Sequence, residues 1–263
     1  MAALQGLGVL VTRPEHQALP LCRLLEAEGA STLRLPAIDI KAVGDPHELR
    51  AGLGDLRRFD VIIFTSANAV RFGAPLLDQR RDLTLIPIGP ATARALNQAG
   101  YGVAAGQEGA PRGGYDSEAL LLHPILEHAQ GRRLLIVTGR NGRGLLQREL
   151  TRRGAQVMTA EVYERRPATP SAAALEALLD DFRSGVVQVI TATSLDIAGS
   201  LLTLATPALR GEFERVHWLV PGERVADGMR KLGLAAPLLS AASADDQDLL
   251  SALIRWRSSV SGA

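Results

Sequence analysis

The chain carries one pattern twice: a short apolar segment, a small polar loop and an amphipathic helix that ends at a glycine. Residues 134–138 resemble residues 8–12, and the helices that follow them end at Gly154 and Gly29, 125 positions apart. Self-similarity at a long, fixed spacing indicates copies of one structural unit. The repeat therefore predicts two related units within one chain.

Two further pairs of segments continue the repeat. Residues 186–194 match residues 61–66, 128 positions apart at their last serine, and residues 218–222 match residues 86–89, 133 positions apart at their last glycine. An offset that grows slowly along the chain is what loop insertions produce. Short strands that alternate with helices predict an α/β fold with parallel sheets covered by helices.

The pattern also predicts individual elements. The expected strands cover residues 8–11, 32–35, 61–64, 85–88, 134–138 and 186–190, and the expected helices cover residues 18–29, 91–100 and 144–152. Pro87 marks an edge strand or a strand end, because proline lacks a backbone N–H. Cys22 falls on the apolar face of the first helix and is expected in the core. From Trp256 on, the chain is expected to fray or to pack only through the indole ring.

Composition excludes several classes of function. Of the 263 residues, 46% are hydrophobic and 22% are charged, which is typical of a soluble globular protein. A formal net charge of +1 and 4% aromatic residues disfavour nucleic acid as a partner. One cysteine and five histidines without ligand spacing predict neither a disulfide framework nor a metal site. Without an apolar run near 18 residues or a basic leader, we expect no membrane partner and a cytoplasmic location. We expect a monomer, because no exposed heptad or apolar strand edge indicates a partner.

Small polar loops follow the strands in both copies. Residues 65–68 read Thr-Ser-Ala-Asn, and their counterparts, residues 193–196, read Thr-Ser-Leu-Asp. Such loops are expected at the C-terminal ends of parallel strands, where open sheets bind ligands. Helix N-termini at that edge offer unpaired N–H groups that favour anions. Two such units facing each other would line one cleft from both sides.

Five motifs resemble those of the uroporphyrinogen-III synthase family. In chain order they are Val-Leu-Val-Thr-Arg-Pro (9–14), Ile-Phe-Thr-Ser-Ala-Asn-Ala-Val (63–70), Ile-Gly-Pro-Ala-Thr-Ala-Arg-Ala-Leu (88–96), Gly-Tyr-Asp-Ser-Glu-Ala-Leu-Leu (114–121) and Val-Tyr-Glu-Arg (162–165). Each motif alone is weak, but together they cover nearly the whole chain in the family's order.

The resemblance implies a fold of two flavodoxin-like domains with parallel sheets, joined by a two-stranded connector. One domain would combine residues 1–36 with 168–263, and the other would span residues 41–162. The connector would be residues 37–40 and 163–167. Without the resemblance, the residues favour a simpler division into two consecutive domains, with the boundary near residue 115.

The resemblance also implies the activity. The family cyclises the linear tetrapyrrole hydroxymethylbilane to uroporphyrinogen III, inverts the terminal ring and loses water, so it is a lyase of porphyrin and heme biosynthesis. It uses no metal and no organic cofactor, and its partner is the small-molecule substrate. A flexible substrate with many carboxylates and a reactive intermediate needs positioning and exclusion of water more than a strong acid.

Two residues match catalytic positions of the family. Tyr163 is the candidate general acid for the leaving hydroxyl, and its alternative role is packing at a hinge. Thr92 matches a family threonine, and its alternative role is a helix N-cap. The corresponding position in the second copy is Val225, which argues against a symmetric pair of threonines.

Ten residues are expected to bind the substrate. They are Arg13, Ser66, Ala67, Asn68, Gly89, Ser117, Arg140, Ser194, Gly222 and Arg224. The alternative for Ser66 or Asn68 is a plain N-cap, and the alternative for Arg13 is a salt bridge to Glu15 or another acid.

Three other functions are alternatives to this activity. A two-lobed binding protein would not change the isomer ratio of products from hydroxymethylbilane, whereas the enzyme would yield isomer III. A nucleotide-sugar transferase would need a nucleotide-binding motif, and the sequence contains none. A regulatory protein that kept the fold without the activity is the third alternative.

Overall fold

The structure is a computed structural model that describes residues 2–78, 80, 82–103, 116–142 and 144–261. Its strands are β1 (Gly8–Val11), β2 (Ser31–Arg34), β3 (Ile38–Ala42), β4 (Val61–Phe64), β5 (Leu85–Pro87), β6 (Arg133–Gly139), β7 (Gln156–Pro167), β8 (Val189–Thr191), β9 (His217–Pro221) and β10 (Leu238–Ala241).

The α-helices are α1 (Glu15–Ala27), α2 (Pro46–Leu53), α3 (Ala67–Gly73), α4 (Pro90–Gln98), α5 (Ser117–Leu120), α6 (Pro124–Glu127), α7 (Leu145–Arg152), α8 (Ala172–Arg183), α9 (Leu195–Leu204), α10 (Pro207–Phe213), α11 (Gly222–Lys231) and α12 (Asp246–Ser261). Two short 3-10 helices are η1 (Leu56–Arg58) and η2 (Ala74–Leu77).

The chain divides into two compact units. Unit 1 combines Met1–Asp39 with Arg166–Ala263, and unit 2 is Ile40–Arg165. A simple cut near residue 115 is therefore wrong, because unit 2 continues on both sides of that position. The cause is pairing between distant strands: β1 lies beside β8 in one sheet, so the two ends of the chain share a unit.

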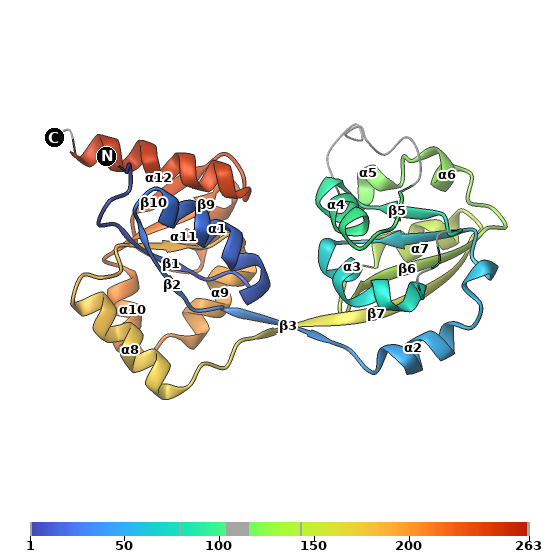
Figure 1. The fold of residues 1–263 in the computed structure, drawn as a ribbon, viewed down its shortest axis with the longest axis horizontal. Coiled ribbons are helices and arrows are strands. Elements are labelled where there is room, and N and C mark those ends of the chain that lie inside the picture. Colours follow the sequence, from blue (N-terminus) through green and yellow to red (C-terminus); the bar gives the residue numbers. More distant parts are fainter. Residues whose placement is uncertain (1, 79, 81, 104–115, 143, 262–263) are drawn as a thin grey trace. The chain divides into compact units, whose positions relative to one another are not determined.

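Each unit contains one five-stranded sheet (Figure 1). In unit 1 the order is β10-β9-β8-β1-β2 and every pair is parallel. In unit 2 the order is β3-β7-β6-β4-β5, and the last four strands are parallel. The repeated segments take matching places, because β9-β8-β1-β2 corresponds to β5-β4-β6-β7. The expected α/β fold with two largely parallel sheets is confirmed.

Helices cover both faces of the unit 1 sheet (Figure 1). Helices α1 and α12 pack together over one face, where Leu219 of β9 joins their core. The neighbouring Trp218 points to the other face, since side chains alternate along a strand. There Trp218 is fully buried and meets Phe213 of α10, which in turn packs against Phe182 of α8.

In unit 2, β4 divides its side chains between two cores. Ile62 and Phe64 pack with residues of α2, α3 and α4, while Val61 and Ile63 pack with residues of α5, α6 and α7. All four side chains are buried. The strand therefore reads in the sequence as an unbroken apolar run, as parallel strands covered on both faces do.

Strand β7 is long and has two neighbours. It pairs in parallel with β6, and its later part lies beside β3. The Val43 N–H donates to the Val162 carbonyl at 3.1 Å, and the Ala168 N–H donates to the Ala37 carbonyl at 3.0 Å. Residue numbers rise along β3 as they fall along β7, so these two strands are antiparallel.

Three local expectations have clear outcomes. Pro87 ends β5, which is an edge strand, as predicted. The strand expected at residues 186–190 begins only at Val189, because Val186 is 44% exposed and its N–H donates to the Asp181 carbonyl in the turn after α8. Of the two alternatives for the C-terminal segment, fraying is wrong, because α12 continues to Ser261, whereas packing through the indole fits, because Trp256 packs against the core that α1 and α12 share.

Candidate functional site

In unit 2 the loops that carry candidate residues meet at one edge of the sheet. Strands β5, β4 and β6 are parallel neighbours, so their C-terminal ends lie together. The Ile88 N–H donates to the Phe64 carbonyl at 2.9 Å, and the Thr65 N–H donates to the Val137 carbonyl at 3.2 Å. The loops after β4, β5 and β6 are therefore held side by side, at the edge where open parallel sheets bind ligands.

Ser66 caps helix α3 at this edge. Its backbone is extended, with φ −171° and ψ 164°, and its Oγ accepts the Ala69 N–H at 2.9 Å. Ala67 begins the helix, and Asn68 is buried in its first turn. The N-cap alternative is thus realised by Ser66. A hydroxyl has a second lone pair and a proton to donate, so capping leaves Ser66 capacity for another partner.

That other partner is Tyr163. The Ser66 Oγ lies 3.1 Å from the Tyr163 Oη, within hydrogen-bond distance, although the residues are 97 positions apart in the chain. The tyrosine is only 5% exposed, and its ring stacks on Phe72 of α3 with centroids 5.9 Å apart and planes at 24°. The structure therefore brings together two residues that the sequence singled out separately.

Thr92 lies in the first turn of α4, beside the same edge. Gly89 is the N-cap of this helix, so the alternative that Thr92 serves as the cap is wrong. Thr92 is 3% exposed, and its hydroxyl makes no side-chain hydrogen bond to another described residue. Since α3 and α4 pack against each other, Thr92 and Ser66 sit at the starts of neighbouring helices.

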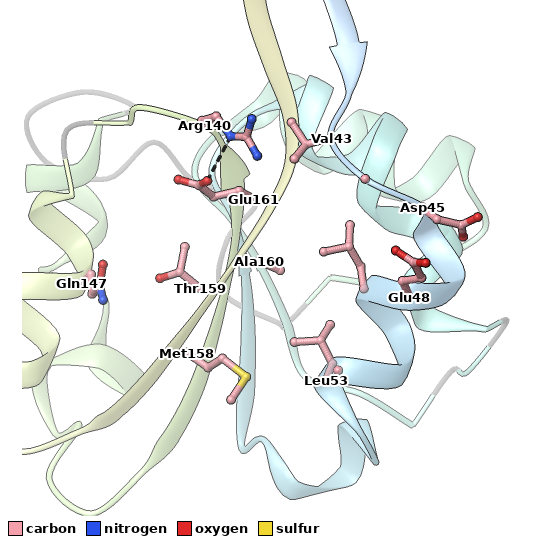
Figure 2. Close-up of a pocket in the computed structure, with 13 residues that line it drawn as sticks. Val43, Asp45, Glu48, Leu53, Arg140, Gln147, Met158, Thr159, Ala160 and Glu161 are labelled. Atoms are coloured by element: carbon pink, nitrogen blue, oxygen red, sulfur yellow. Dashed lines mark hydrogen bonds and ion pairs between the residues drawn. The ribbon is translucent and has the colours of Figure 1, made fainter.

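Arg140 lies at the end of a pocket of about 620 Å³ beside β7 (Figure 2). Its guanidinium is 3.5 Å from carboxylate oxygens of both Glu161 and Glu164. Asp45 and Glu48 join Glu161 as carboxylates of the pocket lining, opposite apolar side chains of β7. This pocket has more negative than positive groups, so it does not favour a substrate rich in carboxylates.

Ser117 is the first residue of the short helix α5. The N-cap is Asp116, whose carboxylate accepts the Ala119 N–H at 2.8 Å. Helix α5 belongs to the core on the α7 face of the sheet, whereas Tyr163 belongs to the core on the α3 face. The first part of the motif at residues 114–121 lies outside the described residues.

Arg13 in unit 1 is held by its own unit. It is 8% exposed, forms an ion pair with Asp246 and donates to the Ala244 carbonyl. The structure therefore shows the alternative of a salt bridge to an acid, but that acid is Asp246, whereas Glu15 pairs with Arg34.

The remaining unit 1 candidates lie after β8 and β9. Ser194 caps α9, accepting the Ile197 N–H at 3.3 Å. Gly222 begins α11 in the left-handed region, with φ +73°. Arg224 is exposed on the first turn of α11, next to Val225, and forms no ion pair with another described residue. Because β8 and β9 are adjacent and parallel, these residues share an edge of the sheet.

Sequence reasoning missed two neighbours of Tyr163. One is Phe72, which is stacked on the ring, and the other is Gly139, the residue of β6 opposite Tyr163 in the register. An aromatic residue in a helix and a glycine at a strand end are common, so neither gave a distinctive signal. Only the pairing of β6 with β7 identifies them.

The described residues contain no group of three or more side chains arranged to hold a metal ion. Among the helices described, none has both the length and the apolar character required to cross a membrane.

Comparison with known proteins gives consistent results. A family model described as uroporphyrinogen-III synthase HemD matches residues 20–250. The chain is 33% identical over 259 residues to the uroporphyrinogen-III synthase of Salmonella typhimurium and 32% identical to that of Escherichia coli, covering 94% of this chain and 100% of each relative.

Solved structures show the same likeness in fold. A mutant uroporphyrinogen III synthase from the extremely thermophilic bacterium Thermus thermophilus has a TM-score of 0.57 at 19% identity, covering 98% of this chain and 100% of that one. The enzyme of Helicobacter pylori 26695 has a TM-score of 0.58 at 14% identity, covering 95% and 99%. The motifs, the sheets and these relatives agree, and the chain belongs to the uroporphyrinogen-III synthase family.

Proposed function

We propose that this protein cyclises hydroxymethylbilane to uroporphyrinogen III, with inversion of the terminal ring and loss of water. Family membership supports the reaction, and the pairing of Ser66 with Tyr163 at the C-terminal edge of the unit 2 sheet supports a site for it. The proposed enzyme is a lyase of heme biosynthesis that acts without a metal or organic cofactor.

Tyr163 is proposed as the general acid. Its phenol donates a proton to the terminal hydroxyl of the substrate, the carbon–oxygen bond breaks, and water leaves. Ring closure later releases a proton from a pyrrole carbon, which returns to the phenolate. Ser66 can donate a hydrogen bond to the phenol oxygen at 3.1 Å, and such a bond stabilises the phenolate as it forms.

Helix starts are proposed to hold the carboxylates. The first turn of α3 is close to Tyr163 and α4 packs against α3, and the small side chains of Ala67 and Gly89 allow a ligand to approach the backbone N–H groups of both first turns. The buried Thr92 hydroxyl is proposed to contact the substrate beside them. In unit 1, Ser194, Gly222 and the exposed Arg224 are proposed to bind further carboxylates.

Other candidates contribute less to this proposal. Asn68 and Ser117 are proposed as secondary contacts, because one is buried in a helical turn and the other lies on α5. Arg13 and Arg140 already face carboxylates, so their proposed role is to hold the loops after β1 and β6 in place.

We also propose that the two units are flavodoxin-like domains. The strand order of unit 1, renumbered along the unit, is 2-1-3-4-5, which is the order of that fold. Residues 37–40 and 163–167, within or next to β3 and β7, would form the connector. The protein is proposed to act in the cytoplasm as a monomer, with no nucleic acid partner.

The test is an isomer analysis of the products. The purified chain is supplied with hydroxymethylbilane, and the products are oxidised to porphyrins and separated into isomers I and III. Spontaneous closure gives the symmetric isomer I, so a predominance of isomer III establishes the activity. Product with the spontaneous isomer ratio would refute it and would favour a binding or regulatory protein.

Tyr163→Phe tests the role of the phenol. Loss of a general acid should reduce turnover about 100-fold or more. Tyr101→Phe is the matched control, because Tyr101 is also buried in the same core of unit 2 and its hydroxyl donates to the Ala74 carbonyl at 3.4 Å. Near-normal turnover of a folded Tyr163→Phe variant would exclude the phenol as the acid.

A further inference from the structure

Strand β7 contains a bulge immediately before Tyr163. Thr138 of β6 is opposite Glu161, but the next residue, Gly139, is opposite Tyr163, so Val162 is an extra residue in the ladder. Bulges are rare between parallel strands and re-aim the side chains that follow them. Val162 and Tyr163 are consecutive and both lie in the core on the α3 face, which regular alternation would not allow.

The re-aimed ring occupies space that Gly139 leaves open. A Cβ atom at position 139 would lie 2.5 Å from the Cζ of Tyr163, 2.8 Å from its Cε2 and 2.9 Å from its Oη. These distances are far below van der Waals contact. The φ of Gly139 is not in the left-handed region, so its backbone suits any residue. Glycine is needed here for space alone.

Two other side chains complete the surroundings of the ring. Phe72 stacks on it with planes at 24°, and Ser66 meets its hydroxyl at 3.1 Å. Both belong to the same short segment, since Ser66 caps α3 and Phe72 lies about one and a half turns further along it. The ring is thus bordered by Gly139 of β6 and Phe72 of α3, and Ser66 meets its oxygen.

We propose that Gly139 and Phe72 are positioning residues that form a slot for Tyr163, and that the slot holds the phenol oxygen against Ser66. The slot explains why a bulge precedes Tyr163: with a regular register, alternation from Ala160 and Val162 would point the side chain at position 163 to the other face of the sheet. The kinetic consequence rests on the proposed function, whereas the position of the ring does not.

The first test compares Gly139→Ala with Gly142→Ala. The new methyl group at position 139 displaces the ring, and a displacement near 1 Å at a reacting group costs about 10- to 100-fold in kcat. The KM for hydroxymethylbilane should change by less than about twofold, because carboxylate contacts remain. Gly142 is the matched control, since a Cβ there would meet only atoms at 3.5 Å. Phe72→Leu provides a second variant that keeps an apolar side chain but loses the stacking.

Coupling to Tyr163 separates positioning from general damage. In a Tyr163→Phe background there is no phenol oxygen to misplace, so adding Gly139→Ala should lower kcat by less than about twofold further. If Gly139→Ala lowered kcat in that background by the same factor as in the wild type, Gly139 would act through the fold rather than through the phenol. That result would overturn the proposal.

The second test requires no substrate. The chain is labelled with ¹³Cζ-tyrosine, and Tyr163→Phe identifies the Tyr163 signal among the three tyrosines. Gly139→Ala, Phe72→Leu and Ser66→Ala should each move that signal, while Gly142→Ala should not. An unmoved signal in Gly139→Ala and Phe72→Leu would show that no slot exists. A moved Tyr163 signal with unchanged kcat in these two variants would equally overturn the proposal that they position the phenol. Failure of the wild type to form isomer III would refute the proposed function alone.

Discussion

Arg13 and Asp246 form an ion pair that joins the loop after β1 to the first residue of α12, 233 positions further along the chain. The arginine side chain is 9% exposed, and its second nitrogen donates to the Ala244 carbonyl. The pair therefore fixes the end of β1 to the C-terminal helix within unit 1. Both of its side chains are less exposed than those of the pair between Arg34 and Glu15.

Removal of Arg13 should destabilise unit 1 more than loss of a surface pair. Arg13→Ala leaves Asp246 and a carbonyl without their donor, which should lower the free energy of unfolding by about 1–3 kcal/mol. Arg34→Ala breaks the exposed pair with Glu15 and should cost less than about 1 kcal/mol. Urea unfolding of both variants measures the difference, and equal losses would contradict the assigned role of the pair.

Ser66 should affect stability and turnover through different bonds. Ser66→Ala removes the cap of α3 and should lower the free energy of unfolding by about 1 kcal/mol, whereas Ser66→Gly should lower it by only a few tenths. Both variants lose the hydrogen bond to Tyr163, so both should lower kcat by about 10-fold. Urea unfolding and isomer III formation measure the two effects.

Ser171 supplies the control for Ser66. It caps α8 in unit 1 by accepting the Ala174 N–H at 3.2 Å, whereas Ser66 and Tyr163 belong to unit 2. Ser171→Ala should therefore cost about 1 kcal/mol with unchanged turnover. If Ser66→Gly and Ser171→Ala had the same kcat, the contact with the phenol would have no part in catalysis.

Two partly buried histidines should make stability depend on pH. Burial lowers the pKa of His123 in unit 2 and of His217 in unit 1 below the ordinary value of 6.5. The unfolded chain then binds more protons than the folded chain below about pH 6.5, so stability is lost as the pH falls through that range. The urea midpoint should be lower at about pH 5.5 than at about pH 7.5.

His217→Gln should reduce this dependence. The His217 ring lies 4.7 Å from the ring of Trp256, so tryptophan fluorescence follows unit 1 through the transition. The glutamine keeps a polar side chain without a titrating group, and its midpoint should vary less over the same pH range. An unchanged slope would mean that other groups carry the pH dependence.

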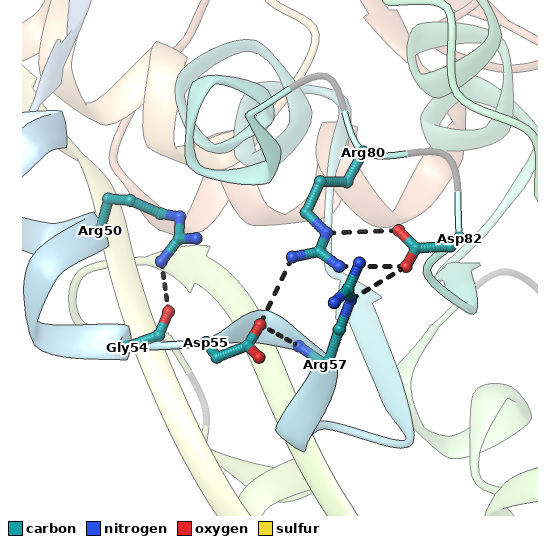
Figure 3. A network of polar contacts seen from close by, with 6 residues as sticks. All are labelled: Arg50, Gly54, Asp55, Arg57, Arg80 and Asp82. Carbon is teal, nitrogen blue, oxygen red and sulfur yellow. Dashed lines mark hydrogen bonds and ion pairs between the residues drawn. The ribbon is translucent and has the colours of Figure 1, made fainter.

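An exposed network of ion pairs and hydrogen bonds in unit 2 should make stability depend on pH in a lower range (Figure 3). Hydrogen bonds from Arg80 lower the pKa of Asp82 from 3.8 to about 2. The folded carboxylate is therefore favoured above pH 3.8, and its contribution is lost as the pH falls toward about 2. Asp82→Asn should remove part of the acid sensitivity in this range. About 1 M salt should abolish the difference between variant and wild type, because exposed pairs are screened.

The sequence predicted the parts of the candidate site but not their contacts. Ser66 and Tyr163 were found from separate motifs, because a polar loop after an apolar strand has a local signal. Their hydrogen bond depends on β4, β6 and β7 lying in one sheet, and that order is a long-range property. The alternative N-cap role of Thr92 failed because Gly89, three residues earlier, is the N-cap and the helix begins at Pro90.

The sequence by itself determined the repeat, the α/β class and the family, because these follow from the order of apolar runs and loops along the chain. Only the tertiary structure decided that β1 lies beside β8 in unit 1, that Arg13 pairs with Asp246, and that Gly139 gives room to Tyr163. Each of those relationships joins residues brought together by strand order or by one inserted residue in β7. A register of that kind is fixed when whole sheets pack, and no local pattern of residues encodes it.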